Sequence, residues 1–239
     1  MKTTTACVEE IILEQPFIEE ALSLGIINYS ALAEHLQPAV SKRLSKTVKS
    51  GAIMMALRRY QAPISVSNSP KMKQTLKNLG DITVRSNLVD FTFRNSPTLI
   101  QSHAKILEQV TTSSIFYAFT RGITESNVII SRSEKDKVAQ SFKHEVQLGL
   151  QEELSAISIE LPRNNPTVSG LYYQLFKRLA WQGITLHEVV STTNEFTILV
   201  RDDLVNQAFS VIKNMRNTCL LYTSPSPRDQ RGSRMPSSA

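Results

Sequence analysis

The order of elements predicted between Leu154 and Met215 constrains the fold more than any other feature of the chain. Alternating apolar and polar residues indicate strands, apolar residues at helical spacing indicate helices, and polar or glycine residues separate them. The predicted elements are a strand over 154–161, a helix over 168–181, strands over 184–190 and 195–201, and a helix over 203–215. This order can form a sheet with both helices on one face.

The same stretch resembles an ACT domain, the amino-acid-sensing module attached to aspartokinases and other enzymes of amino-acid metabolism. The match lies in Ser169-Gly170 at the start of the first helix, 175–179 within it, 183–185 after it, and the strand 196–200. The family often carries an asparagine where this chain has Thr185. The resemblance therefore implies the fold more strongly than it implies the ligand site.

The segment from about 64 to 146 is predicted to be a degenerate second copy of this unit. Its polar stretch 95–98 leads into a helix as 165–167 does. The matching elements are a strand over 81–93, a helix over 99–110, strands over 114–120 and 127–131, and a helix over 134–146. The resemblance implies a tandem pair, since aspartokinase ACT modules join their sheets edge to edge. A shared sheet also hides edge strands that would otherwise invite aggregation.

The first 60 residues carry a helical pattern without strand alternation. Three helices are expected. The first covers 8–22, with a kink or boundary at Pro16 and an end at Gly25, and the second covers 28–36, with a cap at Asn28 or Ser30 and a break at Gln37-Pro38. The third covers 40–57, with a turn near Ser50-Gly51. Three short helices ending in a basic stretch are typical of helix-turn-helix and winged-helix domains, although no wing hairpin follows.

The predicted fold class is therefore α+β. An N-terminal three-helix, winged-helix-like domain over 1–62 precedes a degenerate ACT-like unit over 63–149 and an ACT domain over 150–218. The resemblance implies that the last two are ferredoxin-like βαββαβ units.

Residues 219–239 are predicted to be an artefactual, disordered tail. Back-translation of 219–224 as TGT CTC TTA TAC ACA TCT gives the end sequence recognised by a commonly used library-preparation transposase. The segments 225–229 and 233–239 continue the adapter around 230–232, where a variable index would be read. A natural Pro/Ser tail is the alternative, and fold reasoning leaves such a segment out.

Charge and cysteine content exclude several classes of protein. Without the tail, Lys and Arg number 24 rather than 27 and Asp and Glu 20 rather than 21, so the net charge falls from +6 to +4. This mild surplus does not by itself indicate a polyanion partner. Cys7 remains as the single cysteine, which excludes a disulfide framework within one chain. The sequence holds no apolar run of membrane-spanning length, and we expect a soluble, cytoplasmic protein.

The loop 162–171 is the strongest candidate for a ligand site. Unpaired N–H groups at a helix N-terminus carry partial positive charge and could hold the carboxylate of a free amino acid. In ACT domains the effector commonly sits between this loop and the second strand of a paired unit. The residues implicated are Asn165, Thr167, Ser169, Gly170 and Leu171 from the loop, with Gly183, Ile184 and Thr185 implied by the resemblance. The alternative is that the loop only caps the helix and the module only dimerises.

A basic cluster near the end of the helical segment is a candidate for contact with DNA phosphates. Its members are Lys42, Arg43, Lys46, Lys49, Arg58 and Arg59. The stretch 42–59 contains no acid, whereas six acids lie between Glu9 and Glu34. The alternative is a solvated helix face or a dimer surface.

Candidate catalytic residues are absent from the pattern. The four histidines lack the paired spacing of a metal site, no Gly-rich phosphate loop occurs, and Ser, Asp and His occur without a nucleophile-elbow sequence. The catalytic domain of aspartokinases is missing as well. We therefore expect no enzyme activity, no cofactor and no metal.

These features predict a non-catalytic regulatory protein that senses a small amino acid or a related metabolite and forms a homodimer through its ACT sheets. One alternative is a ligand-responsive transcription regulator whose helical domain contacts DNA. A second alternative is a regulatory subunit of a separate amino-acid biosynthetic enzyme such as aspartokinase.

Overall fold

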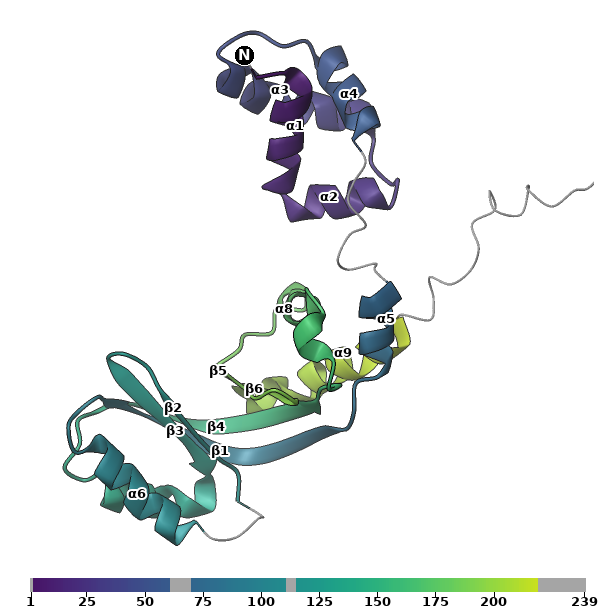
Figure 1. The fold of residues 1–239 in the computed structure, drawn as a ribbon. Helices are drawn as coiled ribbons and strands as arrows, with labels where there is room; N and C mark the ends of the chain where they lie inside the picture. The colour runs from purple at the N-terminus through teal and green to yellow at the C-terminus, as the bar shows by residue number, and fades with distance from the viewer. Residues whose placement is uncertain (1, 61–69, 111–114, 219–239) are drawn as a thin grey trace, which may run out of the picture. The chain divides into compact units, whose positions relative to one another are not determined.

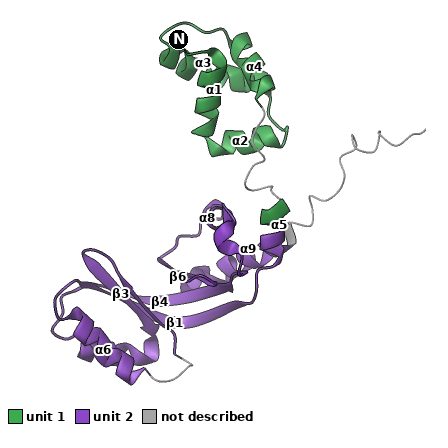
Figure 2. Cartoon of the chain, viewed as in Figure 1, with its two compact units in different colours: residues 1–73 green, residues 74–239 purple. Residues whose placement is uncertain are grey.

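The computed structural model describes residues 2–60, 70–110 and 115–218. The chain divides into two compact units, Met1–Lys73 and Gln74–Ala239, here termed the helical unit and the sheet unit (Figure 2). The predicted adapter tail, 219–239, lies outside the described residues. No helix in the described part of the chain has both the length and the apolar character needed to cross a bilayer.

The helical unit places four helices before residue 60. They are α1 (Thr4–Leu13), α2 (Pro16–Ser23), α3 (Tyr29–Leu44) and α4 (Ser50–Arg59), and a further helix, α5 (Pro70–Lys77), crosses the division between the units. One apolar core holds side chains from α1 to α4. The predicted cap at Asn28 is confirmed, since its Oδ1 accepts hydrogen bonds from the N–H groups of Ser30 and Ala31.

The predicted helix break at Gln37-Pro38 is wrong. Helix α3 runs through Pro38 to Leu44 and ends at Ser45, whose φ is +49°. A proline costs one backbone hydrogen bond, but Leu36 and Val40 on either side of it are buried in the core. Packing therefore holds the helix together, and the described N-terminal region has four helices rather than the three expected.

The sheet unit consists of two repeats with the same element order. The first repeat is β1 (Ile82–Arg94), α6 (Leu99–Gln109), β2 (Tyr117–Arg121), β3 (Glu125–Ser131) and α7 (Lys135–Ser141); the second is β4 (Gln147–Glu160), α8 (Leu171–Trp181), β5 (Glu188–Ser191), β6 (Glu195–Arg201) and α9 (Val205–Thr218). Short 3-10 turns precede α7, α8 and α9. The predicted α+β class is confirmed. Within the described residues each repeat is βαββα, so the fourth strand that would end a βαββαβ unit is absent.

One antiparallel sheet joins the repeats in the order β2-β3-β1-β4-β6-β5 (Figure 1). The joint is the pairing of β1 with β4, which confirms the expected edge-to-edge arrangement. Strand β4 begins at Gln147, seven residues before the predicted start, and α8 begins at Leu171 rather than at residue 168.

Equivalent backbone hydrogen bonds support the internal repeat. The N–H of Asn95 donates to Thr124 in the first repeat, and the N–H of Leu161 donates to Asn194 in the second, at 2.9 and 2.7 Å. Each bond ties the end of the long strand to the turn of the hairpin that follows. The loops 95–98 and 161–170 therefore occupy equivalent positions, as the sequence predicted.

Side chains alternate between the two faces of the sheet, so the strands contribute to two separate apolar layers. In the first repeat, Val89, Phe91 and Phe93 face α6 and α7 in a buried core. Their neighbours on the opposite face contribute to a second cluster, here termed the seam. The buried seam residues are Leu88 and Ile129 from the first repeat with Leu154, Ala156 and Leu199 from the second. The two repeats thus share a core as well as a sheet.

Candidate ligand-binding site

No side chain caps the N-terminus of α8. Gly170 occupies the N-cap with φ +87°. The first turn holds no acidic residue, and Ser169 beside it is exposed. The first N–H groups of a helix have no partner within it and carry partial positive charge. Helix ends of this kind often bind anions.

Two of the predicted ligand residues, Asn165 and Thr167, make hydrogen bonds that hold the loop. The buried Asn165 side chain donates to the carbonyl oxygens of Pro162 at 3.1 Å and of Thr193 at 2.5 Å. The hydroxyl of Thr167 donates to the carbonyl oxygen of Asn164 at 2.9 Å. These bonds fix the path of the chain into α8.

The remaining predicted residues do not gather at one place. Leu171 and Ile184 are buried apolar side chains, whereas Thr185 is exposed. Gly183, with φ +68°, follows the C-terminal end of α8, and Gly170 precedes its N-terminal end. The helix has 11 residues, so its ends lie about 16 Å apart. A ligand that contacts both the loop before α8 and the residues 183–185 after it would need to take them from two different ACT-like units.

A polar contact between the repeats was missed by the sequence analysis. Asp90 on β1 is 2% exposed and accepts hydrogen bonds from Asn127 Nδ2 at 3.0 Å and from His187 Nε2 at 2.8 Å. His187 precedes β5 and lies 97 positions away from Asp90 in sequence. No local pattern in the sequence connects such distant residues.

A second missed cluster lies at the equivalent loop of the first repeat. The carboxylate of Glu145 accepts from Ser96 Oγ at 2.5 Å and from Ser102 Oγ at 2.8 Å. Thr98 donates to it as well. Burial opposes ionisation of Glu145, but these hydroxyl donors together with nearby His144 outweigh it and hold the pKa of the carboxyl below its usual value. The loop thus already contains a carboxylate.

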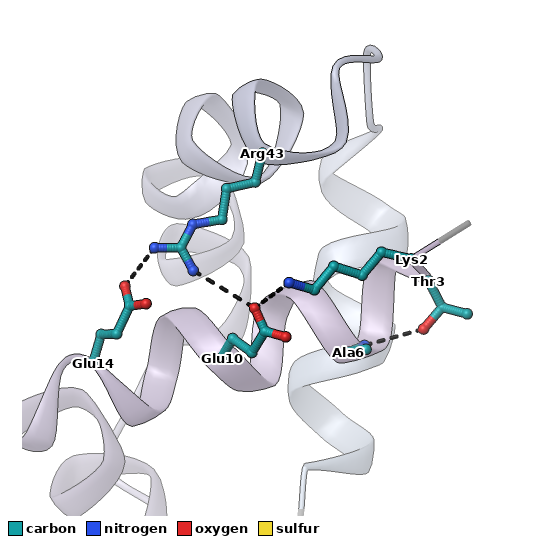
Figure 3. A network of polar contacts seen from close by, with 6 residues as sticks. All are labelled: Lys2, Thr3, Ala6, Glu10, Glu14 and Arg43. Carbon is teal, nitrogen blue, oxygen red and sulfur yellow. Dashed lines mark hydrogen bonds and ion pairs between the residues drawn. The ribbon is translucent and has the colours of Figure 1, made fainter.

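One member of the basic cluster in the helical unit, Arg43, belongs to an ion-pair network. Arg43 donates to Glu14 at 2.5 Å and lies 3.9 Å from Glu10, which also pairs with Lys2 (Figure 3). The hydrogen bond from Arg43 lowers the pKa of Glu14. The other five basic residues, Lys42, Lys46, Lys49, Arg58 and Arg59, are exposed. Arg43 is therefore engaged within the unit.

The comparisons with known proteins identify a fold. No protein-family model and no curated protein sequence matches the chain. Among solved structures, the chain is similar to the aspartate kinase of Clostridium acetobutylicum with a TM-score of 0.50 and 12% identity, over 58% of this chain and 35% of that one. The chain thus spans about a third of that enzyme.

Two further structures match at lower scores. The aspartate kinase of Synechocystis has a TM-score of 0.49 and 11% identity, over 74% of this chain and 32% of that one. The regulatory subunit of aspartate kinase from Thermus thermophilus has a TM-score of 0.46 and 8% identity, over 57% of this chain and 97% of that one. At such identities the likeness concerns the fold alone. The likeness to the Clostridium structure agrees with the fold that the resemblance to aspartokinases implied.

Proposed function

We propose that the chain is a non-catalytic regulatory protein that senses a small amino acid or a related metabolite through its two ACT-like repeats. The observation that carries the proposal is the single sheet and shared seam that both repeats build. The fold likeness to the Clostridium aspartate kinase, an allosteric enzyme, supports it. A ligand that binds one arrangement of the repeats more tightly than another would shift the chain toward that arrangement.

The α8 N-terminus is the end at which the ligand carboxylate would bind. Calorimetric titration of the full chain with each common amino acid tests this assignment. We expect one amino acid to give binding heat and to raise the thermal midpoint. Absence of heat and of any thermal shift with all of them would remove the sensor function.

A matched pair of variants places the site. Ser169→Asp puts a carboxylate beside the open N–H groups, where it competes with the ligand, whereas Ser169→Asn has a similar shape without the charge. We expect Ser169→Asp to weaken binding about tenfold or more, which corresponds to about 1.4 kcal/mol, and Ser169→Asn to bind nearly as the wild type does. Equal binding by both variants would move the site away from α8.

The sensor would act on other molecules through assembly. We infer a homodimer formed through exposed edges of the sheet, of which β2 and β5 are the outer strands. Light scattering after size-exclusion chromatography measures the assembly. A regulatory subunit would further co-purify with a separate biosynthetic enzyme.

A second candidate function is DNA binding by the helical unit. The observation that favours it is the exposure of five basic residues on α3, α4 and the turn between them, in a stretch without acids. A mobility-shift assay on duplex DNA across a salt series would test it, since phosphate contacts make affinity fall steeply with salt. We expect Lys46→Ala with Lys49→Ala to weaken binding more than Arg43→Ala, because Arg43 already pairs with Glu14. No shift at low salt would exclude this function.

A further inference from the structure

The first repeat differs from the second in what its strand-to-helix loop contains. Loops 95–98 and 161–170 are equivalent by their backbone bonds to the following hairpin turns. In the first repeat the loop surrounds the carboxylate of Glu145, which comes from the connection between α7 and β4. Neither α6 nor α8 has an acidic residue in its first turn or a side-chain cap, so the contact with Glu145 is what distinguishes the first loop.

The contacts around Glu145 have the chemistry of a carboxylate-binding site. Ser96 donates to one carboxylate oxygen and Ser102 donates to the other. Ser102 is 7% exposed and lies in the first turn of α6, where the helix dipole favours negative charge. Hydrogen bonds to a charged acceptor are stronger than those between neutral groups. Glu145 itself remains partly exposed, so a solute can reach this position.

We infer that Ser96, Thr98 and Ser102 form a carboxylate-binding site that the chain's own Glu145 occupies. The first repeat is thereby closed to an external carboxylate, and the second repeat holds the open loop. The occupied site stands on the contacts of Glu145 alone. Only the consequence that a chain takes up one effector rather than two rests on the proposed sensor function.

Chemical rescue by acetate tests the occupied site without knowledge of the effector. Glu145→Ala removes the internal carboxylate and leaves its donors in place. We expect this variant to melt below the wild type in sodium chloride and to gain about 2–4 °C when about 200 mM acetate replaces chloride, for an acetate Kd of about 50 mM. The wild type should show no acetate-specific gain.

Two further variants make the test decisive. Glu145→Gln fills the same space with an amide, so it should melt below the wild type without responding to acetate. Glu145→Ala combined with Ser102→Ala removes a buried donor and should lose most of the rescue. If Glu145→Ala does not fold in chloride, the yield of refolding in acetate against chloride gives the same measurement.

The outcomes separate this inference from the sensor proposal. Equal effects of acetate and chloride on Glu145→Ala, or equal acetate effects on this variant and the wild type, would overturn the occupied site. A chain that binds no amino acid would still give the acetate result. Where the wild type does bind an amino acid, its heat should be lost in Ser169→Asp and kept in Glu145→Ala.

Discussion

At the scale of single residues, the bond between His187 and Asp90 makes the stability of the sheet depend on pH. The hydrogen bond with Asp90 raises the pKa of His187 against the lowering effect of burial, and the charges of Asp90 and Glu188 raise it further. Folding therefore favours the protonated ring. This contribution to stability is complete below the unfolded pKa of about 6.5 and is lost as the pH rises through the higher folded value.

Replacing His187 with Gln keeps a donor near Asp90 and removes the titration. We expect the free energy of unfolding of the wild type to fall relative to that of His187→Gln as the pH rises above about 6.5, by about 1 kcal/mol because the side chain is 31% exposed. Urea unfolding at a series of pH values measures the difference. His35→Gln, an exposed site in the helical unit, is the control. Identical pH profiles for the wild type and His187→Gln would contradict the assignment.

Residue roles were predictable where the partners are local. The sequence offered Asn28 or Ser30 as the cap, and the structure shows Asn28 in that role. The contacts of Asp90 with His187 and of Glu145 with Ser96 join residues 97 and 49 positions apart. Only the folded topology brings such residues together, so no local sequence pattern indicates either cluster.

At the scale of elements, two irregular positions shape the long strands. Asn87 on β1 and Glu153 on β4 have φ values of +60° and +57°. The register of the two strands shifts between Arg85 and Leu88. Because side chains alternate along a strand, one extra residue returns the apolar positions on both sides of the irregularity to the same face. The bulges thus reverse the alternation of side chains between the two halves of each long strand.

A substitution at Asn87 tests the bulge. Valine normally suits an exposed strand position better than asparagine does. At φ +60° a β-branched side chain is strained, so we expect Asn87→Val to lower the free energy of unfolding by about 1–2 kcal/mol. Asn87→Gly should stay within about 0.5 kcal/mol of the wild type, because relieved strain offsets the added freedom of the unfolded chain.

The control for this test is Thr83→Val in the same strand. Thr83 is also exposed and lies at an ordinary φ. The substitution Thr83→Val should be neutral or slightly stabilising in the same urea titration. A stabilising Asn87→Val would show that β1 is regular in solution.

Element types were more predictable than element ends. The order of strands and helices in both repeats follows from apolar periodicity, and the helix α6 was predicted to within one residue at its end. Strand β4 extends seven residues further back because β1 supplies a partner there, as Leu150 pairs with Phe91. Helix α3 passes Pro38 because its apolar neighbours are buried. In both cases tertiary contacts override the local signal.

At the scale of the whole sheet unit, the seam makes the two repeats one folding body. Its four large apolar side chains, Leu88, Ile129, Leu154 and Leu199, are at most 1% exposed. Burying each contributes about 1.5–3 kcal/mol, hence about 6–12 kcal/mol together. The net stability of a domain is about 5–15 kcal/mol. Each repeat supplies two of these side chains, so separating the repeats would cost each one about 3–6 kcal/mol, a large part of that net stability.

Cutting the chain between Lys143 and His144 tests this dependence. Each fragment, 1–143 or 144–239, would expose its half of the seam and lose the β1–β4 pairing. We expect neither fragment alone to protect the amides of β3 or β6 from hydrogen exchange, and we expect the two fragments to protect them and to co-purify when expressed together. Intact chain with Gly-Ser inserted at the same point should remain protected. Native-like protection of β3 or β6 in a lone fragment would show that one repeat folds without the seam.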